Sequence, residues 1–97
     1  MEMHQIRYFL ALCEVRSFTG AARRCCVAQP SLTNAIKALE RELGGALFQR
    51  KPRVELTALG RAVRPYLREI ARQAGKARAT ARMIAAARPA ISVRPHV

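Results

Sequence analysis

Residues 17–43 read SFTGAARRCCVAQPSLTNAIKALEREL and predict two short helices joined by a tight turn. Ala21 and Ala22 are small enough to let a second helix approach the first closely. Apolar residues recur on both sides of the turn, at Cys25, Val27, Leu32, Ala35, Ile36 and Leu39. This is the spacing of a helix-turn-helix unit, in which the second helix is presented outward.

The outward side of the predicted second helix is polar. Its residues are Gln29, Ser31, Thr33, Asn34 and Lys37. These short hydrogen-bonding groups and one cation suit base edges and phosphates better than they suit a protein core. We therefore expect this face to bind nucleic acid.

A helix is also predicted before this unit, from Met3 to about Val15. Ile6, Phe9, Leu10 and Cys13 recur there at steps of three and four, which marks one buried helical face.

Ser17 and Thr19 open the helix expected at about residues 18–25. Ser17 is a favourable N-cap, because its hydroxyl can accept hydrogen bonds from amides two or three residues ahead. Capping alone explains this serine, and a contact with DNA is the alternative. Thr19 lies in the first turn, where free backbone amides suit a phosphate.

The next helix should start near Ala28 or Gln29 and end at about Leu43. Pro30 fits a first turn, where amide donors have no intrahelical partner. Ala28 is a poor cap, so the start of this helix is expected to fray or to be capped by another residue. Gly44 favours its end, since glycine readily takes the left-handed conformation.

Residues 46–57, ALFQRKPRVELT, place apolar ends around a polar centre. This pattern predicts a short two-stranded hairpin with Pro52 in its loop, which beside a helix-turn-helix unit forms a wing. Arg50, Lys51 and Arg53 crowd its tip, where they suit phosphate or minor-groove contacts. A merely solvated loop in a very basic chain is the alternative.

A long helix, capped by Thr57, is predicted from Ala58 to about Ala87. Its apolar residues recur at steps of three and four, close to a heptad pattern, at Leu59, Val63, Tyr66, Ile70, Ala74, Ala77, Ala81 and Ile84. About thirty residues span roughly 45 Å at 1.5 Å per residue, more than so small a domain covers. We expect this seam to meet a second copy of the chain, and Pro65 to kink the helix.

The composition predicts one compact module with a polyanionic partner. Eighteen Lys and Arg against six Asp and Glu give a net charge of +12, and residues 58–97 hold nine basic groups and one acidic group. Nucleic acid is the first candidate partner and an anionic membrane surface the second. No apolar run is long enough to cross a bilayer and no signal-peptide pattern is present, which predicts a cytoplasmic protein.

The three cysteines indicate neither a disulfide framework nor a metal site. They lack paired spacing and nearby histidines. Cys13 and Cys25 are expected in the core. Cys26 is expected in the turn as an exposed thiol.

The carboxylates show no paired arrangement for acid–base chemistry, and we expect neither an enzyme nor a bound cofactor. Glu40 and Glu42 are expected to balance Lys37 and Arg41 on the helix surface.

The sequence resembles the N-terminal DNA-binding region of LysR-type bacterial transcriptional regulators over about residues 3–87. The matching segments are, in order, IRYFLAL, SFTGAA, VAQPSLTNAIKALERELG, LFQR and LTALG. This resemblance implies a winged helix-turn-helix followed by a linker helix that pairs antiparallel with another subunit. It also implies that the wing touches the minor groove and that the major groove receives Gln29, Pro30, Ser31, Thr33, Asn34 and Lys37.

The expected chain is mainly α, with a winged helix-turn-helix at 1–57, a linker or dimerisation helix at 58–88 and a disordered tail at 89–97. Its expected function is sequence-specific binding of double-stranded DNA at an inverted repeat. The binding form should be a homodimer, with higher oligomers in a full-length form. An architectural or RNA-associated basic protein that reads no sequence is the alternative. Family members continue into an effector-sensing domain, and we expect no small-molecule effector site in these 97 residues.

Overall fold

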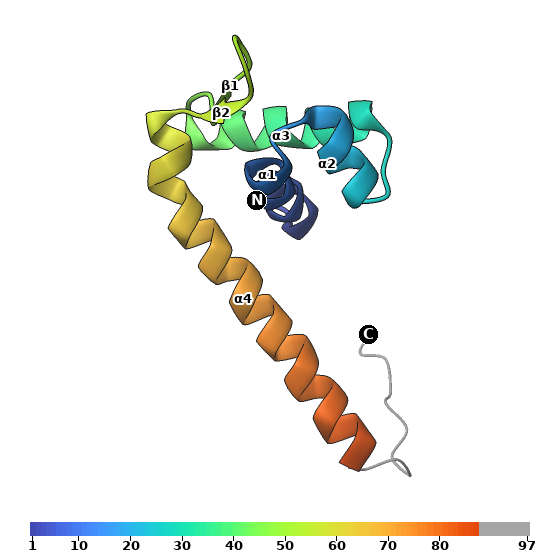
Figure 1. Cartoon of the computed structure of the whole chain (residues 1–97). Helices are drawn as coiled ribbons and strands as arrows, with labels where there is room; N and C mark the ends of the chain where they lie inside the picture. The colour runs from blue at the N-terminus through green and yellow to red at the C-terminus, as the bar shows by residue number, and fades with distance from the viewer. Residues whose placement is uncertain (88–97) are drawn as a thin grey trace.

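The computed structural model describes residues 1–87, which form four helices and a two-stranded wing (Figure 1). The elements are, in chain order, α1 (Met3–Val15), α2 (Phe18–Arg24), α3 (Gln29–Leu43), β1 (Phe48–Gln49), β2 (Glu55–Leu56) and α4 (Ala58–Ala87). The predicted winged helix-turn-helix with a long following helix is confirmed. The tail expected at 89–97 lies outside the described residues.

Local hydrogen bonds set both ends of α1. At its start Glu2 and Gln5 form a capping box, in which the Glu2 amide donates to the Gln5 side-chain oxygen at 3.0 Å. At its end Arg16 takes the left-handed conformation, with φ 58°, and its amide donates to the Leu12 carbonyl at 2.9 Å. The chain therefore turns sharply into α2.

Ser17 caps α2 as predicted, because its hydroxyl oxygen accepts a hydrogen bond from the Gly20 amide at 3.0 Å. The helix ends at Arg24, one residue earlier than expected, and Cys25 is its C-cap. Cys26 then takes a positive φ of 59° in the turn that leads to α3.

The start of α3 has no side-chain cap, as the alanine at position 28 predicted. Instead the amides of Ser31 and Leu32 donate to the Ala28 carbonyl at 3.0 and 3.2 Å. Pro30 lies in the first turn, where its missing amide proton costs no intrahelical bond. The helix ends at Leu43, and its C-cap Gly44 has a φ of 85°, in the left-handed region.

The wing is a short antiparallel pair in which Phe48 lies opposite Leu56 and Gln49 opposite Glu55. The rings of Phe48 and Phe9 pack with their centroids 5.4 Å apart, which joins the wing to α1.

Thr57 joins the wing to α4. Its hydroxyl accepts a hydrogen bond from the Gly60 amide at 3.1 Å, as the predicted cap requires, and donates to the Ala46 carbonyl at 2.6 Å. A side chain at Gly60 would collide with the Leu47 carbonyl oxygen, so this glycine permits a close approach of α4 to the wing. The helix continues through Pro65 and extends away from the other elements (Figure 1). The kink expected at Pro65 stays a prediction.

One apolar core joins the three N-terminal helices, the wing and the first half of α4. Its largest fully buried side chains are Ile6, Phe9, Leu12, Leu32, Ile36, Leu39 and Leu47. From α4, Leu67 is 2% exposed, and the partly buried Leu59, Val63 and Ala71 pack beside it. The orientation of α4 relative to the helix-turn-helix unit is therefore set by packing within a single chain.

Candidate nucleic-acid interface

Helix α3 has an apolar side in the core and a polar side in solvent. The buried residues are Leu32, Ala35, Ile36 and Leu39. The exposed residues are Gln29, Pro30, Ser31, Asn34 and Lys37, and Thr33 is half-buried at the edge of this face. The predicted polar row thus lies on the surface, and the core packing of the opposite side holds it there.

Thr19 and Gln29, both predicted as DNA contacts, touch each other. The Thr19 hydroxyl donates to the Gln29 side-chain oxygen at 2.9 Å. Ser17 differs, because its oxygen serves the cap of α2 and its side chain is half-buried. This arrangement favours the capping interpretation of Ser17 over a DNA contact.

The turn between α2 and α3 is closed by backbone hydrogen bonds. The Cys26 amide donates to the Arg23 carbonyl at 3.2 Å, and the Val27 amide donates to the Ala22 carbonyl at 3.0 Å. These bonds fix the first turn of α3 against α2.

The wing cations have defined neighbours. The Arg50 guanidinium lies over the Phe18 ring, with its central carbon 4.4 Å from the ring centroid. The Arg53 Nε donates to Glu55 at 2.6 Å, although Arg53 remains 78% exposed. Lys51 is exposed and has no salt bridge among residues 1–87. The sequence interpretation missed Phe18, whose position at the start of α2 gave no sign of a contact with the wing.

The carboxylates of α3 do not pair with Lys37 and Arg41, and that prediction was wrong. Glu40 accepts a hydrogen bond from the Leu47 amide at 2.8 Å, which fixes the start of the wing. Glu42 lies 3.0 Å from the N-terminal ammonium group. Both carboxylates serve donors outside α3, which helix spacing does not reveal. Lys37 therefore keeps a positive charge that neither carboxylate neutralises.

The apolar seam of α4 lies in two environments. Leu59 and Val63 pack on the core of their own chain, together with Leu67 and Ala71, which the sequence interpretation did not assign. The other predicted seam residues are exposed or half-buried: Tyr66, Ile70, Ala74, Ala77, Ala81 and Ile84. Tyr66 is 72% exposed and Ile84 56%, so an apolar stripe remains open beyond the core.

Glu69 is held by its neighbours on α4. Arg72 donates to both carboxylate oxygens at 3.0 Å, and Gln73 donates at 2.7 Å. These hydrogen bonds, of which the one from Arg72 has the largest effect, lower the pKa of the Glu69 carboxyl to about 2. The hydrogen bond with Glu69 in turn raises the pKa of Arg72. The other cations of α4 lie on exposed or half-buried side chains, at Arg61, Arg64, Arg68, Lys76, Arg78 and Arg82.

Cys13 is buried and Cys26 is exposed, as predicted, whereas Cys25 is only half-buried and packs against the core from its edge. Burial raises the pKa of the Cys13 thiol to about 11, against the opposing effect of Arg64 and Arg68. Within residues 1–87 no three His, Cys, Asp or Glu side chains gather as metal ligands would. No helix in that range combines the length and apolar composition that a membrane span requires.

A helix-turn-helix with an exposed polar second helix, a wing and a long following helix defines the class of winged helix-turn-helix proteins. Residues 3–61 match the family of bacterial regulatory helix-turn-helix proteins of the LysR type. The chain belongs to this family.

The relatives include named transcriptional regulators. The regulator TfdT of Cupriavidus pinatubonensis is 42% identical over 87 residues, which cover 84% of this chain and 38% of TfdT. The regulator ClcR of Pseudomonas putida is 51% identical over 61 residues, which cover 62% of this chain and 21% of ClcR. The chain therefore spans less than half the length of either relative.

Solved structures share the fold. The DNA-binding domain of CbnR, crystallised with DNA, aligns with a TM-score of 0.77 and 43% identity over 91% of this chain and 100% of that chain. The DNA-binding domain of BenM, in complex with catB site 1 DNA, aligns with a TM-score of 0.81 and 36% identity over 88% of this chain and 97% of that chain. Full-length OxyR from Pseudomonas aeruginosa aligns with a TM-score of 0.81 and 36% identity, over 86% of this chain and 28% of OxyR.

Proposed function

We propose that this chain is the sequence-specific, double-stranded-DNA-binding module of a bacterial transcriptional regulator. The observation that carries the proposal is the exposed polar row of α3, held outward by the buried opposite side of the same helix. The DNA complexes of the CbnR and BenM domains support it, because both share this fold with at least 36% identity. The net charge of +12 supplies the long-range attraction to a polyanion.

In this proposal α3 enters the major groove. The amides of Gln29 and Asn34 suit base edges, since each carries a donor and an acceptor in one plane. Lys37, a point charge on a flexible stem, suits a phosphate. The remaining members of the face, Pro30, Ser31 and Thr33, fix its distance from the duplex.

In the same proposal the wing contacts the adjoining DNA backbone or minor groove. Lys51 and Arg53 are exposed at its tip, and Arg50 is held against α2 by Phe18. An arginine with a fixed position loses less conformational entropy on binding than a free one.

We also propose that two copies pair along the exposed stripe of α4, from Tyr66 to Ile84. A two-fold axis between them would present two α3 helices to an inverted repeat. Higher oligomers would arise in a full-length form, and the site of action would be the bacterial cytoplasm, where the chromosome lies.

A selection from random duplexes tests the proposal. Bound fragments are amplified and sequenced, and the affinity for the selected duplex is compared with that for a scrambled duplex at physiological salt. We expect an inverted-repeat consensus and a preference of roughly a thousandfold or more. Equal affinity for selected duplex, scrambled duplex and structured RNA would instead support a basic protein that reads no sequence.

A further inference from the structure

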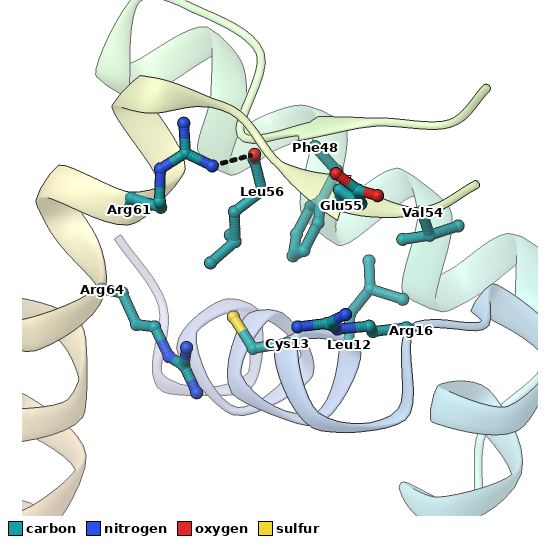
Figure 2. Close-up of a pocket in the computed structure, with 9 residues that line it drawn as sticks. All are labelled: Leu12, Cys13, Arg16, Phe48, Val54, Glu55, Leu56, Arg61 and Arg64. Atoms are coloured by element: carbon teal, nitrogen blue, oxygen red, sulfur yellow. Dashed lines mark hydrogen bonds between the residues drawn. The ribbon is translucent and has the colours of Figure 1, made fainter. Parts of the chain in front are cut away.

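A cavity of about 270 Å³ lies beneath the wing, between the C-terminal end of α1 and the start of α4 (Figure 2). It lies at the junction of the three elements that orient the helix-turn-helix unit on α4. Nothing in the proposed DNA contacts uses it.

The rim of this cavity is cationic. Arg16, Arg61 and Arg64 line it, and the one carboxylate that residues 1–87 contribute to the lining, Glu55, is already bonded to Arg53 at 2.6 Å. Arg61 donates one hydrogen bond, to the Leu56 carbonyl at 3.0 Å. Three guanidinium groups around one neutralised carboxylate attract an anion.

Arg64 carries an unexplained donor. Its Nε is buried and has no hydrogen-bond partner among the described residues. A buried donor without a partner costs free energy, so native proteins usually supply an acceptor from protein, water or ligand. In Figure 2 the guanidinium groups of Arg64 and Arg16 flank Cys13, and both charges act on its thiol. An anion between them would satisfy charges for which residues 1–87 supply no salt-bridge partner.

One side of the cavity is apolar, although most of its accessible lining is polar. Leu12, Phe48, Val54 and Leu56 contribute this side. Hydrated inorganic anions gain nothing from such a wall, whereas a hydrocarbon group does. The volume lies just below the roughly 300–1,000 Å³ of sites for drug-sized ligands, so the ligand must be small.

We propose that this cavity binds a small organic carboxylate, with its charge at the arginines and its hydrocarbon against the apolar wall. This proposal departs from the expectation that the 97 residues hold no small-molecule effector site. Because the ligand would touch α1, the wing and α4 together, it would restrict changes in the angle between the helix-turn-helix unit and α4. That angle sets how two paired copies present their α3 helices.

Amide chemical shifts of the DNA-free, nitrogen-15-labelled chain test the proposal, with phenylacetate as the probe and phenylacetamide, acetate and inorganic phosphate as comparators at equal ionic strength. We expect saturable shifts at Cys13, Leu56 and Arg64 with phenylacetate, and weaker binding by roughly tenfold or more for each comparator. Arg64→Gln should weaken phenylacetate binding to a similar degree. Arg78→Gln removes the same charge from α4 away from the cavity and should leave binding unchanged.

Three results would overturn the proposal. The first is equal binding of phenylacetamide, which would make the site merely apolar. The second is a shift pattern that follows ionic strength along the whole of α4. The third is a pattern that follows protein concentration, which would place a side chain of a second copy in the cavity. The comparison of phenylacetate with phenylacetamide uses the unaltered chain, so it tests the proposal even if Arg64→Gln fails to fold. It needs no DNA, so its result does not depend on the proposed function.

Discussion

The Thr19 hydroxyl donates a 2.9 Å hydrogen bond to the side-chain oxygen of Gln29, and so joins the first turn of α2 to the first residue of α3. A carbonyl oxygen has two acceptor sites, and the Gln29 amide nitrogen keeps both of its donors. The bond therefore orients the Gln29 amide without using up its capacity to bind a base. In the proposed function, α2 would thus orient a side chain of the DNA-binding face of α3 before DNA binds.

Replacing Thr19 with valine should weaken binding to the selected duplex. Thr19→Val keeps the β-branched shape and removes the hydroxyl, so the expected loss is about 0.5–1.5 kcal/mol in binding free energy. Binding to a random duplex should not change. Titration of both duplexes at one salt concentration measures the difference, and an equal loss on both would place Thr19 at a phosphate instead.

Gln29→Ala should cost about 1–3 kcal/mol on the selected duplex and relax the preference at one base position. If Thr19 acts by orienting Gln29, adding Thr19→Val to Gln29→Ala should produce little further loss. A double-mutant cycle measures this coupling. Losses that simply add would show that the two residues act independently.

Lys37→Ala should weaken binding to all duplexes by a similar factor. A lysine at a phosphate releases about one counterion, so the slope of log affinity against log salt should fall by about 1. Arg78→Ala, which removes the same charge from α4, is the matched control and should leave the slope nearly unchanged. A change of base preference in Lys37→Ala would instead assign Lys37 to a base.

The helices could be predicted from the sequence because their signals are local. Ser17 and Thr57 mark helix starts, Gly44 marks an end, and the spacing of apolar residues marks the buried sides. The exposed row of α3 followed from the same spacing.

The contacts that position the site could not be predicted in this way. Glu40 bonds the Leu47 amide, and Arg50 stacks on Phe18, a residue 32 positions earlier in the chain. Such contacts depend on how the elements pack, which no local pattern encodes. The same limit applies to α4, where one stripe of apolar residues did not reveal that Leu67 packs on its own core.

The two glycines of α4 should respond in opposite directions to alanine. At Gly60 a Cβ would collide with the Leu47 carbonyl oxygen, so Gly60→Ala should destabilise the fold by about 1–3 kcal/mol. At Gly75 nothing lies within 4 Å of a Cβ, so Gly75→Ala should stabilise it by up to about 1 kcal/mol. Urea unfolding measures both, and stabilisation of both variants would contradict the close approach at Gly60.

Ile70→Lys should weaken pairing between copies. Ile70 is 41% exposed on the open stripe of α4, and a lysine there would place two like charges near the proposed two-fold axis. Met83 is 71% exposed but lies off the stripe. It comes one residue before the stripe residue Ile84, and one residue turns the helix by about 100°. Met83→Lys is therefore the matched control. Sedimentation equilibrium should show more single chains for Ile70→Lys only, and equal behaviour of the two variants would place the interface elsewhere.

Cys13 should make the fold less stable at alkaline pH. Burial raises the pKa of its thiol from the ordinary 9.0 to about 11, so the unfolded chain ionises this thiol first as the pH rises. The contribution of the protonated Cys13 thiol to stability is fully present below 9.0, the pKa in the unfolded chain. It is lost as the pH rises from 9.0 to about 11. Urea unfolding at about pH 8 and about pH 10.5 should show a smaller loss of stability in Cys13→Ala than in the parent chain. Cys26→Ala removes an exposed thiol and should lose as much stability as the parent. If Cys13→Ala loses as much as the parent, ionisation of the buried thiol is not linked to unfolding.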